Sequence, residues 1–431
     1  MGRPSHHLSA RKAAEHIVRT LTGAGHIAYF AGGCVRDELL GLTPTDYDVA
    51  TDASPDRIAA LFPRTAEVGA SFGVMLVRID SEVIEVATFR SDGEYTDRRR
   101  PNTVTFSDPL QDAHRRDYTV NALFLDPILA DHPSPPIEHA PGAAIVPVAA
   151  HGRVIDFVGG IADLERRVLR AVGDPDQRLA EDHLRALRAA RLAAKLGLTI
   201  DPPTAAAITR HASDLQGVSR ERIGEEVRRI AEHPSRAQGA ALIHSLGLER
   251  PVFLQSGAQG PRSWRTLSNL PAEVGFATAL AAWALDLGVV GLAPLPLVQQ
   301  FRNTLTLSND VRDQFAFILA TLPTLEREWD SLPVARQKRL AASAWFWEAT
   351  SVLRAKDPST AARVEARVGE LAQTHGGLKP DPYVSGDDLT AMGLTPGPRF
   401  KVILDGVYDA QLEGRVQNRD AALELARGMR V

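Results

Sequence analysis

The chain has 431 residues, of which 44% are hydrophobic and 24% are charged, as in an ordinary globular protein of two to four domains. Its net charge of −4 excludes a protein that coats nucleic acid nonspecifically, so an RNA contact must use a local patch. No apolar run approaches the ~20 residues of a membrane span, the N-terminus lacks a signal-peptide core, and a single cysteine excludes an internal disulfide. We therefore predict a cytoplasmic protein with no membrane partner.

The first informative segment is a predicted strand, tight turn and helix near residue 30. An apolar run at 27–31 precedes Gly32 and Gly33, and the helical stretch 35–40 is followed by Gly41, which can adopt the left-handed conformation that ends a helix. A turn at a helix N-terminus presents backbone N–H groups to an anion. The segment therefore predicts a phosphate-binding turn.

A pair of carboxylates follows this turn. Asp46 and Asp48 are two residues apart, so in an extended segment both point to one face and can bind a hard cation. Two-metal nucleotidyl transfer needs a third carboxylate, and Glu85 is the candidate because it interrupts the apolar run 83–89. The alternative interpretation of Glu85 is an exposed position on an edge strand. A phosphate turn beside paired carboxylates indicates phosphoryl or nucleotidyl transfer.

The N-terminal part mixes short strand patterns with short helices. The runs 75–79 and 83–89 predict a strand pair, and Ser54 followed by Pro55 predicts a capped helix start. The segment 127–153 is rich in proline, which cannot support a strand ladder or a helix interior. We interpret it as an insertion at a hairpin tip.

From residue 174 the sequence is rich in alanine, leucine and arginine with a 3.6-residue period, which predicts helices throughout. Clusters of proline and glycine divide this helical part. We predict an α+β fold in which a small mixed-sheet head precedes helical domains. The predicted domains are a head at 1–173, a neck at 174–255, a body at 256–376 and a tail at 377–431.

The neck carries a pair of charged residues, Asp182 and Arg185. On a helix they are neighbours at i and i+3, for which a surface salt bridge is the default interpretation. However, Leu192 and Leu196 share the sector of Arg185, so this face is not plainly exposed. Aspartate accepts from an exocyclic amine and arginine donates to a ring nitrogen, an edge that cytosine and adenine present and uracil and guanine do not. The pair would therefore select CTP and ATP.

Five motifs occur in one order along residues 27–230. They are Gly-Gly-x-x-Arg-Asp from Gly32, Asp-x-Asp from Asp46, Arg-Arg-Asp-x-Thr-x-Asn-Ala from Arg115, Glu-Asp-x-x-Arg-x-x-Arg from Glu181, and Glu-Arg-Ile-Gly-Glu-Glu from Glu221. Together they resemble the bacterial class II CCA-adding tRNA nucleotidyltransferase and poly(A) polymerase family. The resemblance implies a polymerase-β-like nucleotidyltransferase head.

The resemblance also implies roles for individual residues. Those implied for triphosphate binding are Gly32, Gly33 and Arg36. Asp46 and Asp48 would bind Mg²⁺, and Glu85 would complete the acidic set. The residues implied for nucleotide phosphate and ribose are Arg116, Asp117 and Asn121. Asp182 and Arg185 would template the incoming base, with Arg188 and Arg191 on phosphate or RNA.

Two further segments bear on the choice among family members. The stretch 94–106, with the arginine triplet 98–100, resembles the mobile loop that the family uses when it switches from CTP to ATP, which argues against a CC-only enzyme. The tail segment 384–398 resembles that of tRNA-adding members. Pro398 can open a helix whose N-terminus holds an RNA phosphate, although an ordinary packing corner explains the pattern equally well.

The implied function is addition of C and A to the tRNA 3′ end from CTP and ATP. An enzyme that adds only the terminal A is an alternative. A poly(A) polymerase is disfavoured, because poly(A) polymerases of this family carry a basic segment after the metal-binding strand and the corresponding stretch 68–73 has no basic residue. An inactive RNA-binding or nucleotide-sensing module is a different class of hypothesis, opposed by the presence of both Asp46 and Asp48. Cys34 has no general base placed near it in the sequence, so we interpret it as a small buried core residue and not as a nucleophile. The sequence leaves the oligomeric state open.

Overall fold

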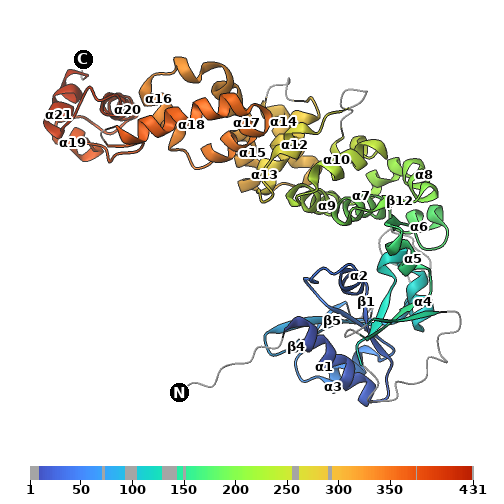
Figure 1. Ribbon diagram of the computed structural model, residues 1–431. Coiled ribbons are helices and arrows are strands. Elements are labelled where there is room, and N and C mark those ends of the chain that lie inside the picture. The colour runs from blue at the N-terminus through green and yellow to red at the C-terminus, as the bar shows by residue number, and fades with distance from the viewer. Residues whose placement is uncertain are drawn as a thin grey trace. The chain divides into compact units, whose positions relative to one another are not determined.

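The computed structural model describes residues 9–69, 73–92, 104–128, 143–148, 152–254, 262–289, 294–374 and 376–429. The chain forms two compact units (Figure 1). Unit 1 comprises Met1–Ile223 and Leu242–Val252, and unit 2 comprises Gly224–Ala241 and Phe253–Val431. The finer boundaries of head, neck, body and tail stay predictions. Within the described ranges, no helix is long and apolar enough to cross a membrane.

Unit 1 is built on an eight-stranded mixed sheet in the described part of the chain. Its strands are β1 (Ala28–Ala31), β2 (Asp48–Thr51), β3 (Thr65–Gly69), β4 (Val74–Ile79), β5 (Glu82–Thr88), β8 (Phe124–Asp126), β9 (Ala144–Val148) and β10 (Gly152–Asp156). The spatial order is β3-β4-β5-β2-β1-β8-β10-β9. The β2–β5 pair is parallel, and the other neighbouring pairs are antiparallel. Two short pairs stand apart, β6 (Arg90–Asp92) with β7 (Val104–Phe106), and β11 (Val168–Leu169) with β12 (Thr199–Ile200).

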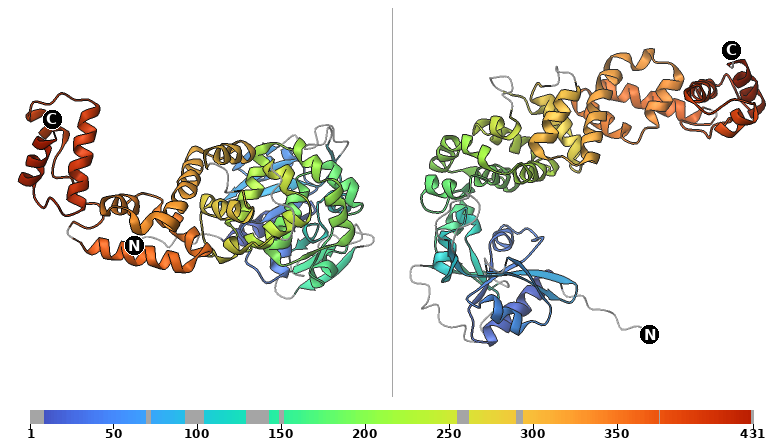
Figure 2. Two further views of the ribbon diagram at one scale, coloured as in Figure 1. Left: turned by 90° about the horizontal axis from the view of Figure 1, so that it is seen from above. Right: turned by 180° about the vertical axis from the view of Figure 1, so that it is seen from behind.

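Helices cover the sheet and continue into a helical segment. Those within unit 1 are α1 (Ala10–Gly23), α2 (Gly33–Leu39), α3 (Pro55–Leu61), α4 (Pro109–His114), η2 (Thr119–Asn121), α5 (Gly160–Glu165), α6 (Pro175–Glu181), α7 (Arg185–Leu196), α8 (Pro202–Arg210) and η4 (Ala212–Gly217). The unit boundary falls within α9 (Arg220–Glu232), α10 (Arg236–Ser245) and α11 (Glu249–Phe253). α1 packs on β1, β2 and β5 through a stripe made of Ala13, Ala14, Ile17, Val18 and Leu21. In the right view of Figure 2, helices of the blue N-terminal part lie against the strands of the sheet.

Several predicted elements are confirmed. The run 75–79 and all but the last residue of the run 83–89 lie in the antiparallel pair β4–β5. The side chain of Ser54 accepts a hydrogen bond from the N–H of Arg57 at the start of α3. Gly41 has φ of 70° just after α2, in the left-handed region that a residue with a Cβ rarely adopts.

Two predictions about strands are corrected. We predicted that the proline-rich segment 127–153 supports no ladder, but β9 contains Pro147 and pairs with β10. β9 is the last strand of the sheet, and an edge strand tolerates proline because one side needs no partner. Residues 129–142 and 149–151 of this insertion lie outside the described residues. The neck, predicted as wholly helical, contributes β12, which pairs in parallel with β11.

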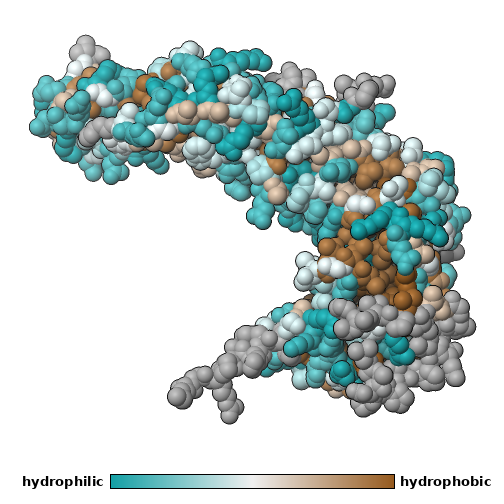
Figure 3. Space-filling model, viewed as in Figure 1, coloured by the Kyte–Doolittle hydropathy of each residue, from teal (hydrophilic) through white to brown (hydrophobic). Residues whose placement is uncertain are grey.

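The described residues of unit 2 form helices joined by loops and contain no strand. Its elements are α12 (Arg265–Asn269), α13 (Phe276–Asp286), α14 (Pro294–Leu305), α15 (Asn309–Pro323), η5 (Thr324–Glu328), η6 (Trp329–Ser331), α16 (Val334–Ala341), α17 (Phe346–Lys356), α18 (Pro358–Gln373), α19 (Gly386–Ala391), α20 (Pro398–Leu412) and α21 (Arg419–Gly428). Trp283 and Trp329 lie in its interior, and Leu389, Ile403 and Val407 belong to a separate cluster formed by α19 to α21. The outer surface of these last helices is mostly hydrophilic on the face shown in Figure 3.

Candidate active site

Three carboxylates gather where β2 and β5 lie side by side. Asp48 begins β2 and is the register partner of Glu85 on β5, and Asp46 lies two residues before it. Glu85 is exposed, but β5 lies between β4 and β2, so the edge-strand alternative is wrong. The sheet therefore brings together the acidic residues that the sequence analysis singled out.

These carboxylates disfavour one another's ionisation. Asp48 exposes part of its surface, yet partial burial of its carboxylate, together with Glu85 and Asp46, raises its pKa to about 7. Burial and Asp46 also raise the pKa of Glu85. Each pKa rises because the surrounding protein and the neighbouring negative charge both disfavour the ionised form. Arg116 opposes the rise at Asp48 and Arg90 opposes it at Glu85, but neither reverses it, so the protein compensates the negative charge only in part.

This donor set fits a divalent cation in its chemistry. Carboxylate oxygens are the ligands that Mg²⁺ prefers, and a cation would relieve the repulsion that raises the pKa of Asp48. Within the ranges that the structure describes, no group of three or more His, Cys, Asp or Glu side chains is already arranged closely enough to enclose a metal ion. A cation would therefore draw the carboxylates together or keep water or substrate oxygens among its ligands.

The glycine turn between β1 and α2 is lined by two guanidinium groups. Gly32 has φ of 78°, and a Cβ there would lie 3.0 Å from Nη1 of Arg116. A Cβ on Gly33 would lie 3.5 Å from Nη2 of Arg36. The absence of side chains thus lets the backbone of the turn and both cations face the same space. Such a turn at a helix start suits a phosphate.

A hydrogen-bond network leads from this turn to α7. Arg36 donates to the side-chain oxygen of Asn121, and the amide nitrogen of Asn121 donates to Oδ1 of Asp117 at 3.1 Å. Oδ2 of Asp117 accepts from Arg188 at 2.9 and 2.7 Å. Burial alone would raise the pKa of Asp117, but Arg188 and Arg185 lower it well below the usual range of an aspartate. Both oxygens of Asp117 are thus occupied within the protein.

Arg115 and Arg116 share a buried carboxylate that the sequence analysis did not single out. Asp112 on α4 accepts from Nε of Arg115 at 2.8 Å and from Nη2 of Arg116 at 2.9 Å. Burial opposes ionisation of Asp112, but the two arginines lower its pKa overall. Arg116 also lies 5.1 Å from the ring centre of Phe124. Asp112 could have been found from its i, i+3 and i, i+4 spacing to the two arginines.

The neck pair Asp182 and Arg185 differs from its prediction. We placed both on one helix at i and i+3, but α6 ends at Glu181 and Asp182 is extended, with φ of −147°. The carboxylate of Asp182 accepts from the N–H of Leu184 at 3.1 Å, which caps the break between the two helices. The i and i+3 geometry is therefore wrong for this pair.

Each member of the neck pair is held by a partner of its own. Oδ2 of Asp182 accepts from Arg222 at 2.7 Å. Nη1 of the buried Arg185 donates to Glu181 at 2.7 Å and to the carbonyl of Arg178 at 2.8 Å. The i, i+4 spacing could have identified Glu181, whereas no local signal points to Arg222.

The remaining site predictions have varied outcomes. Arg191 lies half-buried on α7. Cys34 is buried, and burial raises the pKa of its thiol to about 12, so it is a filler rather than a nucleophile. Of the implied mobile loop at 94–106, residues 94–103 with the arginine triplet lie outside the described residues, and 104–106 form β7, which pairs with β6.

A mixed sheet that places three carboxylates beside a guanidinium-lined glycine turn is the architecture of a nucleotidyltransferase. The description "Poly A polymerase head domain" fits residues 28–170, and "Probable RNA and SrmB-binding site of polymerase A" fits residues 197–256. The CCA-adding enzyme of Geobacillus thermodenitrificans is 32% identical over 93% of each chain, and that of Levilactobacillus brevis is 33% identical over 96% of each chain. The chain belongs to the family of CCA-adding enzymes, which are nucleotidyltransferases and for which divalent-metal dependence is expected.

Solved structures agree with this assignment. The Bacillus stearothermophilus CCA-adding enzyme in complex with CTP superposes with a TM-score of 0.76 at 27% identity, covering 98% of both chains. A Thermotoga maritima CCA-adding enzyme complexed with tRNA has a TM-score of 0.67 at 17% identity and shows the same fold.

Proposed function

We propose that this chain adds C and A to the 3′ end of tRNA, using CTP and ATP and releasing diphosphate. The observation that carries the proposal is that the chain resembles enzymes named for CCA addition over nearly its whole length. We call Asp46, Asp48 and Glu85, which lie at the start of β2 and beside it on β5, the acidic edge. The acidic edge beside the glycine turn supplies the chemistry that such a reaction needs.

In this proposal, different residues of unit 1 bind the metal ions and the triphosphate. Asp46 and Asp48 hold Mg²⁺, with Glu85 completing the negative set. The chemistry that bound Mg²⁺ supplies is activation of the tRNA 3′-hydroxyl and neutralisation of the triphosphate. Arg36, which is also paired with Asp37, and Arg116 line the turn formed by Gly32 and Gly33, where the triphosphate would meet the start of α2.

The network behind the turn positions these groups. Because Asp117 is buried and both its oxygens accept hydrogen bonds within the protein, it fixes Asn121 and Arg188 rather than contacting phosphate itself. Asn121 in turn orients Arg36 at the turn. Arg191 lies three residues beyond Arg188 on α7, where it would contact an RNA phosphate.

Base selection falls to Asp182 and Arg185. A carboxylate has about four acceptor sites and a guanidinium about five donors. Asp182 accepts from Leu184 and Arg222, and Arg185 donates to Glu181 and to the carbonyls of Arg178 and Arg115, so both groups keep some capacity to meet a base edge. Cytosine and adenine offer an exocyclic amine beside a ring acceptor, which this pair complements. The protein contacts preorganise the pair, so its orientation does not depend on the incoming nucleotide.

Primer extension tests the proposal. Three versions of one tRNA, ending before the CCA, after the first C and after CC, are incubated with Mg²⁺ and CTP, ATP or both. We expect all three to be completed to CCA and to stop there. Addition of a single A to the CC-ending tRNA alone would mean the A-adding alternative, and a long A tail would mean a poly(A) polymerase. A magnesium-free reaction with EDTA should give no product.

A further inference from the structure

The two metal-binding aspartates are held by different means. Asp48 is fixed by the sheet, because its backbone pairs with Ala31 on one side and with Glu85 on the other. Asp46 lies before the first residue of β2, on the connection that follows α2, where no ladder fixes the backbone. The distance between the two carboxylates therefore depends on what holds the residue between them.

That residue is Tyr47, which is 7% exposed and points away from the two exposed aspartates. This alternation is that of an extended segment, in which neighbouring side chains leave opposite faces. The Tyr47 hydroxyl donates to Oε1 of Glu38, near the end of α2, at 2.8 Å. Its ring meets that of Phe30 on β1 edge to face, with centroids 5.3 Å apart.

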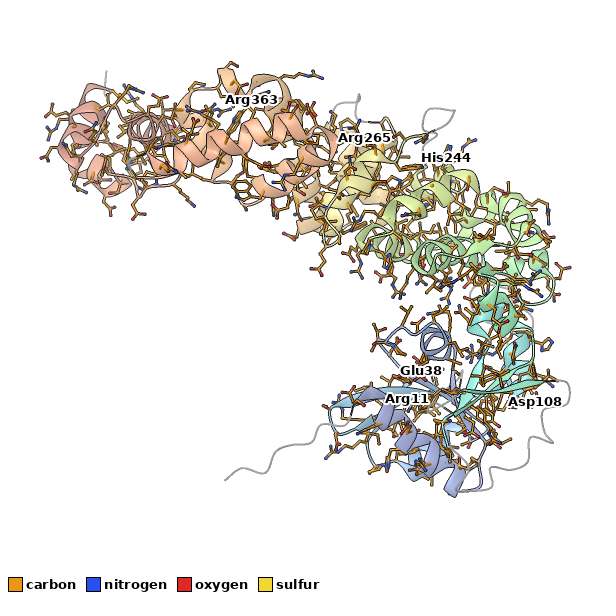
Figure 4. All side chains as sticks on the ribbon, viewed as in Figure 1. Arg11, Glu38, Asp108, His244, Arg265 and Arg363 are labelled. Atoms are coloured by element: carbon orange, nitrogen blue, oxygen red, sulfur yellow. The ribbon has the colours of Figure 1, made fainter. Side chains whose placement is uncertain are left out.

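Glu38 is itself fixed from a third element. Nε of Arg11 on α1 donates to the same Oε1 of Glu38 at 2.9 Å, and the Arg11 guanidinium lies 5.7 Å from the centre of the Phe30 ring. Figure 4 shows Arg11 and Glu38 side by side. We call Arg11, Phe30, Glu38 and Tyr47 the Tyr47 anchor. It joins α1, β1 and α2 behind the aspartate pair.

We propose that the Tyr47 anchor is a positioning device for the metal site, in which the hydrogen bond from Tyr47 to Glu38 sets the place of Asp46 relative to Asp48. The proposal rests on the metal-binding role given to these aspartates above. Groups behind metal ligands orient them, and removal of such a group typically weakens metal binding about 10- to 100-fold. Tyr47 touches neither the nucleotide nor the reacting atoms in this role.

The substitution Tyr47→Phe isolates the hydrogen bond, because it keeps the ring on Phe30 and removes the hydroxyl. Direct Mn²⁺ binding to the protein without tRNA or nucleotide, followed by the electron paramagnetic resonance of free Mn²⁺, is the first readout. We expect Mn²⁺ affinity to fall about tenfold. The Mg²⁺ concentration for half-maximal CCA addition should rise in parallel, with kcat recovered at high Mg²⁺.

A matched control removes a hydroxyl from the same sheet. Tyr29 neighbours Phe30 on β1, but its side chain leaves the opposite face of the strand and packs its ring on Phe89 and Phe124, so Tyr29→Phe should leave Mn²⁺ affinity unchanged. Thermal melting separates positioning from stability: the proposal expects both variants to stay folded at the assay temperature. Unchanged Mn²⁺ affinity in a folded Tyr47→Phe protein would overturn it, even if activity fell.

A double-substitution cycle tests the route through Glu38. Glu38→Ala removes the acceptor, so Mn²⁺ affinity should fall as in Tyr47→Phe, and the double variant should bind no more weakly than Glu38→Ala alone. Independent, additive losses would mean that the hydrogen bond is not the element that positions Asp46. Because Mn²⁺ binding needs no substrate, this result stands apart from the primer-extension test: failure to add CCA with intact anchor coupling would overturn the proposed function alone.

Discussion

Two regions of unit 1 compensate their charges in opposite ways: the acidic edge (Asp46, Asp48 and Glu85) and the network of Arg36, Asn121, Asp117 and Arg188. At the acidic edge, Arg116 and Arg90 offset the negative charge only in part, and burial with the neighbouring carboxylates still raises the pKa of Asp48 to about 7 and raises that of Glu85. In the network, by contrast, Asp117 is engaged by Arg188 and Asn121, and its pKa is lowered.

The difference indicates which region gains from a ligand and which is already paired within the protein. Carboxylates whose charge is only partly compensated gain from a cation supplied from outside the chain. Side chains whose charges are already paired within the protein gain little from a further ion, and their partners keep them in a fixed orientation. Selection of a base edge requires such fixed donors and acceptors. Changes at the edge should therefore cost activity without stability, and changes in the network should cost specificity or stability.

The largest expected effect is that of Asp48→Asn. Metal-bound charge stabilisation is worth several kcal/mol and each 1.36 kcal/mol is tenfold in rate, so CCA addition should fall about 10³-fold. The melting temperature without Mg²⁺ should not fall, because the substitution removes repulsion from Asp46 and Glu85. Single-turnover extension and thermal melting check both halves.

The turn between β4 and β5 provides the control for that experiment. Asp80 has φ of 52°, a conformation that asparagine also tolerates, so Asp80→Asn should leave both rate and melting temperature unchanged. A clear loss of stability in Asp48→Asn would mean that the acidic edge is structural and would remove the contrast.

The next effect sharpens the comparison from the neck. An asparagine at position 182 can donate where aspartate only accepts, so Asp182→Asn should admit the carbonyl of uracil. A good bidentate base contact is worth about 1–3 kcal/mol, so the ratio of kcat/KM for CTP over UTP should fall about 10- to 100-fold. Asp176→Asn on α6, where the carboxylate pairs with exposed Arg210, should leave this ratio unchanged. An unchanged ratio in Asp182→Asn would place base selection elsewhere.

The sequence predicts well what depends on local periodicity. Alternation along the extended segment that leads into β2 predicted Asp46 and Asp48 on one face, and the glycine turn is followed by α2 as expected. The break between α6 and α7 was not predicted. An aspartate can bind a base edge, but it can also cap a helix, and here Asp182 accepts from the N–H of Leu184 and interrupts the helical pattern. The bond from Arg222 to Asp182 joins residues 40 apart, and no local pattern encodes such a pair.

A smaller effect concerns the stability of the network itself. Asp117→Ala leaves Arg188 without its carboxylate, and breaking a buried pair costs about 3–5 kcal/mol. Because the Arg188 side chain is 39% exposed, water compensates part of the loss, and we expect about 2 kcal/mol. Hydrogen exchange of the amides of α7 and η2 during native-state opening measures this cost. Asp176→Ala should leave the same amides unaffected, and equal effects in the two variants would contradict the network.

The smallest expected effect is a pH dependence at Asp112. Its pKa is lowered in the folded protein, so its pairing with Arg115 and Arg116 stabilises the fold fully above the unfolded value of about 3.9 and is lost as pH falls through the lower folded value. The stability gap between the wild-type protein and Asp112→Asn, measured by urea unfolding, should therefore be widest near neutral pH and shrink below about pH 4. A gap that stays constant with pH would mean that Asp112 acts through hydrogen bonds that survive its protonation. Since Asp112 fixes Arg116 beside Gly32, a shrinking gap would also show that the turn is held by ionised groups, unlike the acidic edge, whose charge the protein compensates only in part.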